Sequence, residues 1–346
     1  MKLRRSAEAA PVASTAAPWR VLVVDDEPDI HELTELSLRG FTYGGRGLEI
    51  LRALSGAEAR DIMTRKGDIA VALVDVVMET DDAGLRLVDF IRKELGDRFV
   101  RLVIRTGQPG AAPEREVIER YDIDDYKDKT ELTAQKLFTV MRTALRAWAL
   151  QEDLLEANRQ ALYMLAVASE HKDEDTGAHI QRLSEGTRRL ALHLGIEAGE
   201  AARYAEASVL HDIGKLGVPD AILQKPGSLT PDEFATIKRH AAIGEGILSH
   251  SDWFELARAC AATHHERWDG SGYPHGLKGE AIPFIGRIVA VMDVFDALTH
   301  ARPYKQAWPI EQAVAEIERG SGTQFDPRVV ESFLALHRQG QLADVL

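Results

Sequence analysis

The chain has 346 residues, a formal net charge of −13 and a single cysteine. This length accommodates two ordinary domains with buried cores. The acidic balance argues against DNA as a partner, because binding to a phosphate backbone needs a basic face. One cysteine cannot form an internal disulfide, which fits a reducing cytoplasm.

Residues 1–18 begin with basic side chains but contain no continuous apolar segment. We interpret them as a disordered tail and not as a signal peptide. No apolar run elsewhere in the chain is long enough to span a bilayer, so no membrane contact is predicted.

A first domain is predicted over residues 19–147, where short apolar runs end in polar side chains. The runs are 21–24, 69–74 and 102–104, with helical patterns between them. Such runs are typical of buried parallel strands, and their alternation with helices predicts a doubly wound α/β sheet. Because the carboxyl ends of parallel strands converge, Asp25, Asp26 and Asp75 are expected at one edge of this sheet.

Three carboxylates so close together repel one another, and a hard cation such as magnesium relieves the repulsion. Here the sequence resembles the receiver domain of two-component response regulators, across essentially the whole first domain. The resemblance implies that Asp25 and Asp26 bind magnesium and that Asp75 accepts a phosphoryl group from a sensor histidine kinase. It also assigns phosphoryl contacts to Thr106 and Lys129, and the switching aromatic to Tyr126.

Some features of this domain leave other interpretations open. Glu27 is an alternative ligand near the ion, and aspartates after strands can simply cap helices. The sequence also departs from the receiver pattern at Glu79 and Thr130, where receivers usually have proline.

A long helix is predicted to join the two halves, because residues 134–169 contain neither Gly nor Pro and carry apolar residues near helical spacing. We assign 148–165 as a helical linker, which can carry a homodimer contact. In the alternative, one half of the helix packs on each domain, and Gln151 and Asn158 interrupt a strict coiled coil.

The second domain, 166–346, is expected to be all-helical. Thr230 to Glu233 forms a capping box at the start of one helix. Asp293 lies within an apolar helix and should meet a cation or strong donors, since burying an unpaired charge is costly.

Histidines and acids recur through this second domain in an order that indicates metal-assisted hydrolysis. A lone histidine at a helix boundary is usually structural, but imidazoles are good ligands for iron, manganese or zinc, and a carboxylate can bridge two ions. The ordered set is His179, His211, Asp212, His240, His264, His265 and Asp293.

The runs His-Asp-Ile-Gly-Lys at 211–215 and His-His-Glu-Arg-Trp-Asp-Gly-Ser-Gly-Tyr-Pro at 264–274 resemble the HD-GYP subgroup of HD phosphohydrolases. The resemblance covers about residues 165–335 and extends to 225–227, 302–305 and 325–327. It implies a phosphodiesterase that opens cyclic di-GMP to linear pGpG, and it leaves open whether GMP is formed as a further product. It also implies that the ordered set holds two iron or manganese ions, with Asp212 shared between metal binding and catalysis.

Further residues have expected roles in this site. Asp175 is a candidate ligand for a third ion, and an amino-terminal helix cap is its equally weighted alternative. The resemblance favours Lys215 as the group that protonates the leaving oxygen or steadies the phosphate. Arg302 and Lys305 are expected to grip phosphates, and Tyr273 to shape the substrate loop.

The leading hypothesis is thus a cyclic di-GMP phosphodiesterase regulated by phosphorylation of Asp75. One alternative is a catalytically weak adaptor that binds nucleotide or a partner such as a diguanylate cyclase. Another keeps the enzyme and changes its substrate to a different cyclic dinucleotide.

Overall fold

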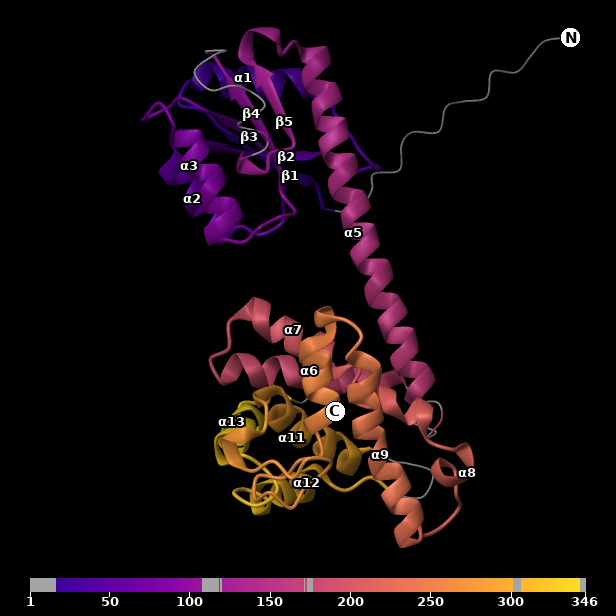
Figure 1. The fold of residues 1–346 in the computed structure, drawn as a ribbon. Coiled ribbons are helices and arrows are strands. Elements are labelled where there is room, and N and C mark those ends of the chain that lie inside the picture. Colours follow the sequence, from indigo (N-terminus) through magenta and orange to yellow (C-terminus); the bar gives the residue numbers. More distant parts are fainter. Residues whose placement is uncertain are drawn as a thin grey trace, which may run out of the picture. The chain divides into compact units, whose positions relative to one another are not determined.

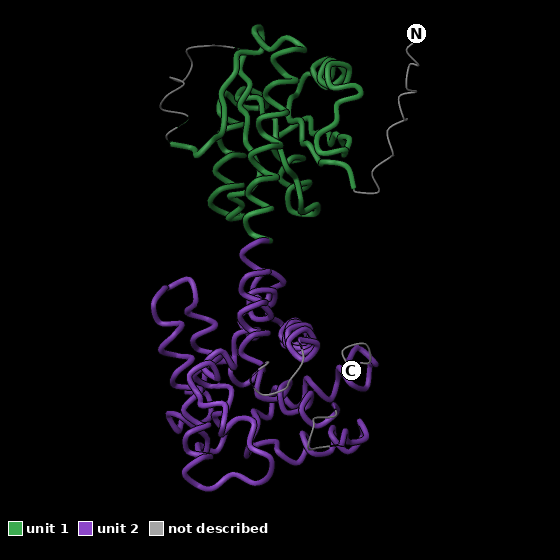
Figure 2. The backbone as a smooth tube through the Cα atoms, turned by 90° about the vertical axis from the view of Figure 1, so that its right-hand side faces the viewer, with its two compact units in different colours: residues 1–156 green, residues 157–346 purple. Residues whose placement is uncertain are grey.

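The computed structural model describes residues 17–107, 118, 120–170, 172, 177–300 and 306–342. Most of the predicted tail, together with Asp175, Arg302 and Lys305, lies outside the described residues. The chain divides into two compact units, Met1–Glu156 and Ala157–Leu346 (Figure 2). Helix α5 (Ala134–Glu170) begins in the first unit and ends in the second.

The first unit is built on a parallel sheet with the order β2-β1-β3-β4-β5 (Figure 1). Strand β3 is central and every one of its residues is buried, which explains its continuous apolar sequence. The predicted doubly wound α/β fold is confirmed. The strands are β1 (Trp19–Val24), β2 (Leu48–Ala53), β3 (Ile69–Asp75), β4 (Arg101–Thr106) and β5 (Asp125–Asp128).

Helices cover both faces of this sheet. On one face, α2 (Gly56–Arg65) and α3 (Ala83–Asp89) pack against alternate strand residues such as Leu22 and Val74. On the other, the first half of α5 packs against the intervening residues, beside α1 (Pro28–Ser37). A π-helical turn, Phe90–Glu94, continues α3, and a 3-10 turn, η2 (Lys129–Glu131), follows β5.

All the regular elements among the described residues of the second unit are helices or helical turns, so the unit is all-α, as predicted. Helix α11 is buried on most of its surface because its sequence is apolar nearly all round, and it packs against α6, α10, α12 and α13. The helices after α5 are α6 (Gly177–His193), α7 (Ala198–Ser208), α8 (Asp220–Leu223), α9 (Pro231–Leu248), α10 (Glu255–Thr263), α11 (Phe284–Thr299), α12 (Ile310–Arg319) and α13 (Pro327–Arg338). Shorter 3-10 turns are η4 (Ile213–Gly217), η5 (Asp252–Phe254) and η6 (Gly279–Ala281).

The predicted capping box is present at the start of α9. Thr230 accepts a hydrogen bond from the backbone of Glu233, whose carboxylate accepts from the backbone of Thr230 and pairs with Lys225 at 2.7 Å. This cap fixes where α9 begins, and α9 carries His240.

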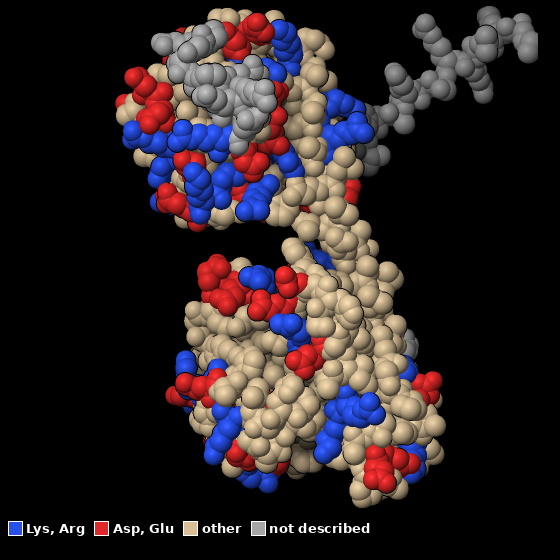
Figure 3. Space-filling model, viewed as in Figure 1, with Lys and Arg blue, Asp and Glu red and all other residues tan. Residues whose placement is uncertain are grey.

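Acidic and basic side chains are interspersed over both units on the face that Figure 3 shows. Among the described helices, none combines the length and the apolar character that crossing a bilayer requires.

Candidate functional site

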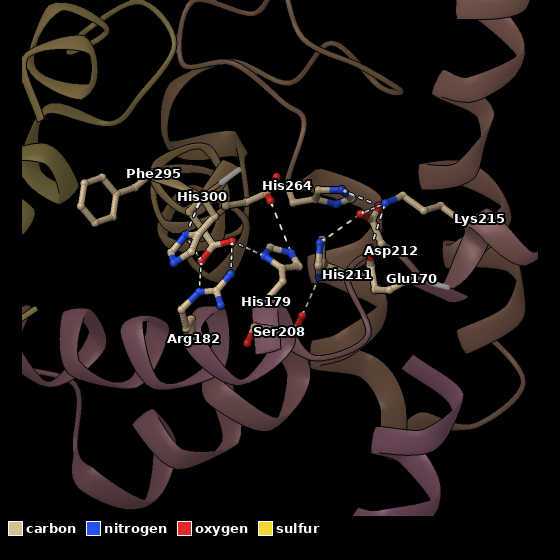
Figure 4. A network of polar contacts seen from close by, with 12 residues as sticks. Glu170, His179, Arg182, Ser208, His211, Asp212, Lys215, His264, Phe295 and His300 are labelled. Atoms are coloured by element: carbon tan, nitrogen blue, oxygen red, sulfur yellow. Dashed lines mark hydrogen bonds and ion pairs between the residues drawn. The ribbon is translucent and has the colours of Figure 1, made fainter. Parts of the chain in front are cut away.

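Side chains from separate helical segments meet in one buried centre in the second unit (Figure 4). His179 comes from α6 and Asp293 from α11, whereas His211 and Asp212 lie in the turn between α7 and η4. The remaining predicted ligands are His240 on α9 and the pair His264 and His265, which directly follows α10. The structure therefore brings the predicted set together, except for Asp175, which lies outside the described residues.

Close packing of η4 against α9 positions two of these groups. A Cβ atom added to Gly214 would lie 1.9 Å from the backbone oxygen of His240, so only glycine allows this approach. The carboxylate of Asp212, two residues earlier, consequently reaches 3.1 Å from Nε2 of His240.

Asp212 lies at the centre of the group. Its Oδ2 is 3.1 Å from Nε2 of His211, and its Oδ1 is 3.5 Å from Nε2 of His264. On the other side of the centre, Nε2 of His179 lies 3.8 Å from Oδ1 of Asp293. Ligand atoms within 4.8 Å of one another form two sets, Asp212, His240, His264 and His265, and Glu170, His179 and His211.

Each of four histidines is fixed by a hydrogen bond from Nδ1 to an oxygen outside the centre. His211 donates to the backbone oxygen of Ser208 at 3.0 Å, and His240 donates to that of Ile237 at 2.7 Å. His264 donates in the same way within its own segment, and His179 donates to a carboxylate. Because Nδ1 carries the proton in every case, a neutral ring presents the lone pair of Nε2 to the centre.

This arrangement fits bound cations. The Nε2 atoms of His240 and His264 lie 3.4 Å apart, and two lone pairs at this distance repel unless a positive charge is present. Nε2 of His211 and Oδ1 of Asp212 are buried and lie 3.1 Å from Asp212 and His240 respectively, but neither atom makes a hydrogen bond of acceptable angle among the described residues. Imidazole and carboxylate donors suit iron, manganese or zinc.

The protein by itself imposes different proton affinities on these rings. Burial works against protonation of His211, but the carboxylates of Asp212, Asp293 and Glu170 together outweigh burial and raise the pKa of His211 to about 9. Burial lowers the pKa of His265 well below its usual range, and the adjacent His264 lowers it further. Neighbouring carboxylates also raise the pKa values of His179 and His240 against the effect of burial, whereas burial lowers that of His264. The centre thus contains two rings that favour the neutral, metal-binding form and three whose protons are displaced when a metal binds.

Asp296 was missed by the sequence reasoning. It lies one helical turn after Asp293 on α11, and its carboxylate accepts the Nδ1 proton of His179 at 2.6 Å. Arg182 also donates to it, at 2.6 and 3.1 Å. Burial raises the pKa of Asp296, but the bonds from His179 and Arg182 outweigh it and hold the pKa at about 2. The feature of the sequence that could have identified Asp296 is that it is a second acidic residue in the otherwise apolar helix α11.

Glu170, at the end of α5, was also missed. Nζ of Lys215 lies 3.2 Å from its Oε2 and 2.9 Å from Oδ2 of Asp212. All three side chains are buried, so the ammonium group is held beside the centre by two carboxylates. Lys172 donates to the backbone oxygens of Lys215, Leu216 and Val218, which steadies η4.

A cavity of about 300 Å³ opens beside His264 and His265. The ring of Tyr273 forms part of its wall, with its centroid 4.8 Å from that of His265. Lys238 and Arg267 add positive charge to the lining, so an anionic ligand in the cavity would reach the histidine cluster.

The acidic residues of the first unit also meet. Asp25 and Asp75 are buried at the carboxyl ends of β1 and β3, and Nζ of Lys129 lies 3.1 and 2.7 Å from their oxygens. Asp26 and Glu27 are exposed beside them, and ligand atoms of Asp25, Asp26 and Glu27 lie within 4.8 Å of one another. Oxygen ligands in this number suit magnesium.

The remaining predicted receiver residues lie at the ends of β4 and β5. Thr106 is buried at the last position of β4, and Tyr126 is partly buried in β5. Thr130, which replaces the usual proline, donates from its backbone and its hydroxyl to Asp128 at 2.8 and 2.7 Å. The turn that carries Lys129 is therefore fixed without proline.

Burial raises the pKa of Asp75, although Lys129 opposes this effect. For Lys129, burial lowers the pKa, but the bonds to Asp75 and Asp25 outweigh it and raise the pKa. Lys129 therefore stays cationic, as a group that neutralises a phosphoryl oxygen must be.

Known proteins resemble both parts of the chain. The HD domain family model matches residues 150–329. A 3'3'-cGAMP-specific phosphodiesterase 2 from Vibrio cholerae is 34% identical, with 93% of this chain and 92% of that protein covered. A cyclic di-GMP phosphodiesterase from Thermotoga maritima is 36% identical, with 92% and 90% covered.

Another relative is the cyclic di-GMP phosphodiesterase response regulator RpfG from Xanthomonas campestris, which is 36% identical, with 91% of this chain and 86% of that protein covered. A solved receiver domain from Clostridium thermocellum is 24% identical and covers 40% of this chain and 98% of its own, with a TM-score of 0.33. The predicted family is confirmed. The chain belongs to the HD domain family, as a response regulator in which a receiver domain precedes an HD-GYP-type domain.

Proposed function

We propose that this protein hydrolyses cyclic di-GMP to linear pGpG at a centre of two iron or manganese ions, with GMP left open as a further product. The observation that carries the proposal is the common orientation of the histidine rings. Four of them donate Nδ1 protons outward, so their Nε2 lone pairs converge on the carboxylates of the centre. Such convergence serves a cation, since it would be repulsive without one.

The two geometric sets suggest how the ions would be held. His240, His264 and His265 would hold one ion, His179, His211 and Asp293 the other, and Asp212 would bridge them. Bound ions would neutralise charge on the phosphate and lower the pKa of a water molecule. Asp175 stays a predicted ligand of a third ion, and Glu170 is a further candidate because it lies with His179 and His211.

The chain itself supplies the remaining chemistry. Lys215 is held by Glu170 and Asp212 with its ammonium group at the edge of the centre. From there it can donate a proton to the departing ribose oxygen or pair with a phosphate oxygen. Tyr273 would orient the substrate against His265, and Arg302 and Lys305 stay predicted phosphate contacts.

The choice of cyclic dinucleotide has a second candidate. The Vibrio cholerae relative, which matches over most of both chains, is described as specific for 3'3'-cGAMP. Hydrolysis of this mixed dinucleotide is therefore the alternative function, and the same centre would perform it.

Turnover by purified, anaerobically loaded protein tests both functions. Iron- or manganese-loaded enzyme should convert cyclic di-GMP to pGpG, with 3'3'-cGAMP assayed in parallel under the same conditions. Turnover by the Asp212→Asn variant should fall to background. The His250→Asn variant, which changes an exposed histidine beyond α9, should keep wild-type turnover. No product from either dinucleotide with metal-loaded wild type would favour the adaptor hypothesis.

Regulation is proposed to act through Asp75. A sensor histidine kinase would phosphorylate this residue with magnesium held at Asp25 and Asp26, and Lys129, Thr106 and Tyr126 would respond to the phosphoryl group. The direct test is turnover before and after treatment with a small acyl phosphate, with Asp75→Asn as the control. Identical turnover in all samples would refute regulation at Asp75.

We also propose a cytoplasmic homodimer formed through α5, and a diguanylate cyclase stays a predicted partner. Leu150 and Leu154 are one helical turn apart on this helix and are 57% and 61% exposed, so they form a small apolar patch that a partner helix would cover. Sedimentation of wild type and Leu154→Glu tests the dimer. A monomeric wild type would refute it.

A further inference from the structure

Arg105 places a buried positive charge beside the proposed phosphorylation site. It lies on β4 in register with Asp75 on β3, one residue before Thr106. Residues in register on parallel strands project to the same face of the sheet. The side chain of Arg105 is only 3% exposed, in a strand whose other central residues are apolar. A buried guanidinium at this position needs an electrostatic reason.

The guanidinium of Arg105 connects Asp25 to helix α1. Its Nη2 lies 3.4 Å from Oδ2 of Asp25, and its Nη1 donates to the hydroxyl of Thr34 on α1 at 3.1 Å. Asp25 is fully buried and is also contacted by Lys129, at 3.1 Å. The proposed magnesium ligand is therefore held between two protein cations.

Two polar atoms in this pocket lack partners. Nε of Arg105 and Oδ1 of Asp75 are buried and make no hydrogen bond among the described residues. The Asp75 oxygen would be satisfied by a bound cation, and the Arg105 nitrogen by a phosphoryl oxygen.

We propose that Arg105 is a fixed counter-cation of the acidic pocket that weakens divalent-cation binding at Asp25 and Asp26 until a phosphoryl group adds negative charge. The inference rests on the proposed assignment of these aspartates to magnesium. Arg105 acts as a positioning residue, because it holds Asp25 and does not itself bind the ion.

The direction of the effect follows from Coulomb's law. A unit charge about 6 Å from a divalent ion changes its affinity about tenfold even at the dielectric constant of water, and by more in a buried site. Removing the guanidinium charge should therefore tighten magnesium binding. A planar guanidinium also suits phosphoryl oxygens, so phosphorylation would turn the same residue into an attractive partner.

Magnesium binding to the full chain can be followed in the receiver by hydrogen exchange. Mass spectrometry of the peptides that contain residues 25–34 gives a magnesium midpoint without interference from metal bound in the second unit. We expect Arg105→Met to lower this midpoint by about tenfold or more relative to wild type. Arg105→Lys keeps the charge and should stay within about threefold of wild type.

Controls separate the local charge from other effects. Arg101→Met removes the same charge from the start of the same strand, where Arg101 pairs with Asp124, and should leave the midpoint unchanged. Arg105→Gln provides a neutral variant that can still bond Thr34, should the methionine variant not fold. A midpoint within twofold of wild type for both neutral variants would overturn the proposal.

The same experiment distinguishes this inference from the proposed function. Labelling of Asp75 by a small acyl phosphate is measured separately by intact mass. If wild type binds magnesium at this peptide but is never labelled, regulation by phosphorylation fails while the midpoints still decide the role of Arg105. Absence of any magnesium-dependent protection in all variants would overturn the magnesium assignment and this inference together.

Discussion

The carboxylate of Asp296 accepts the Nδ1 proton of His179 at 2.6 Å, across a sequence separation of 117 residues. Arg182 donates to the same carboxylate, so the group that aims His179 is itself fixed. Carboxylates in this position hold a metal-binding imidazole in one tautomer and increase its basicity.

We expect Asp296→Ala to lower metal affinity by about 10- to 100-fold, because His179 loses the acceptor that orients it. Metal per chain, measured after dialysis against increasing chelator, checks this result. Asp296→Asn keeps an acceptor and should recover part of the affinity. Asp252→Ala, which removes an acid at the start of η5, should match wild type. Equal metal retention by Asp296→Ala and wild type would contradict the prediction.

Lys215→Met should separate catalysis from metal binding. We expect turnover to fall by about 10²- to 10⁴-fold, as is typical when a general acid is lost. Metal content should be retained, because the substitution removes no ligand. Lys93→Met, which changes an exposed lysine of the first unit, serves as the control. Parallel loss of metal and turnover would instead assign Lys215 a structural role.

Gly214→Ala should destabilise the second unit. The added methyl group would meet the backbone oxygen of His240 at 1.9 Å, and overpacking of this kind costs about 1–3 kcal/mol. Thermal unfolding of the metal-free protein measures the effect. Gly246→Ala on α9 has open space around the new Cβ and should be neutral or stabilising by up to about 1 kcal/mol. Equal melting temperatures for the two variants would refute the close approach of η4 and α9.

The cap of α9 should weaken in acid. The carboxylate of Glu233 accepts hydrogen bonds from Lys225 and from the backbone of Thr230. These bonds hold the pKa of Glu233 at about 2, below the unfolded value near 4.3. A lowered pKa stabilises the fold above the unfolded pKa, and this contribution is lost as the pH falls from about 4 towards 2. The difference in melting temperature between wild type and Glu233→Gln should therefore be present at pH 7 and shrink at pH 3. A difference that is the same at both values would contradict this assignment.

Sequence patterns predicted the parts of the structure that depend on local order. The apolar run of β3 and the absence of Gly and Pro in α5 are properties of neighbouring residues, so both elements could be identified. Strand β2 is largely half-buried and β5 is short and polar, so neither carried a clear apolar run. The exposed Leu33 of α1 shows the limit of periodicity, since His31 and Thr34 occupy the buried face instead.

The groups that the sequence reasoning missed depend on distant partners. Glu170 is explained by Lys215, Asp296 by His179, and Arg105 by Asp25. Asp296 and Arg105 are charged residues in apolar segments and Glu170 is not, but for all three only the folded chain shows the opposite charge or donor that they meet. Such pairings are set by tertiary packing, which a single sequence does not encode in any local pattern.

The acceptor of each Nδ1 proton determines whether a substitution elsewhere in the chain can change the orientation of that imidazole ring. His211, His240 and His264 bond to main-chain oxygens three or four positions earlier, so substitutions elsewhere cannot readily remove their anchors. Among these four rings, only His179 donates its Nδ1 proton to a side chain, which a substitution can replace. Natural or engineered variation at position 296 could therefore retune one half of the centre while the other half keeps its geometry.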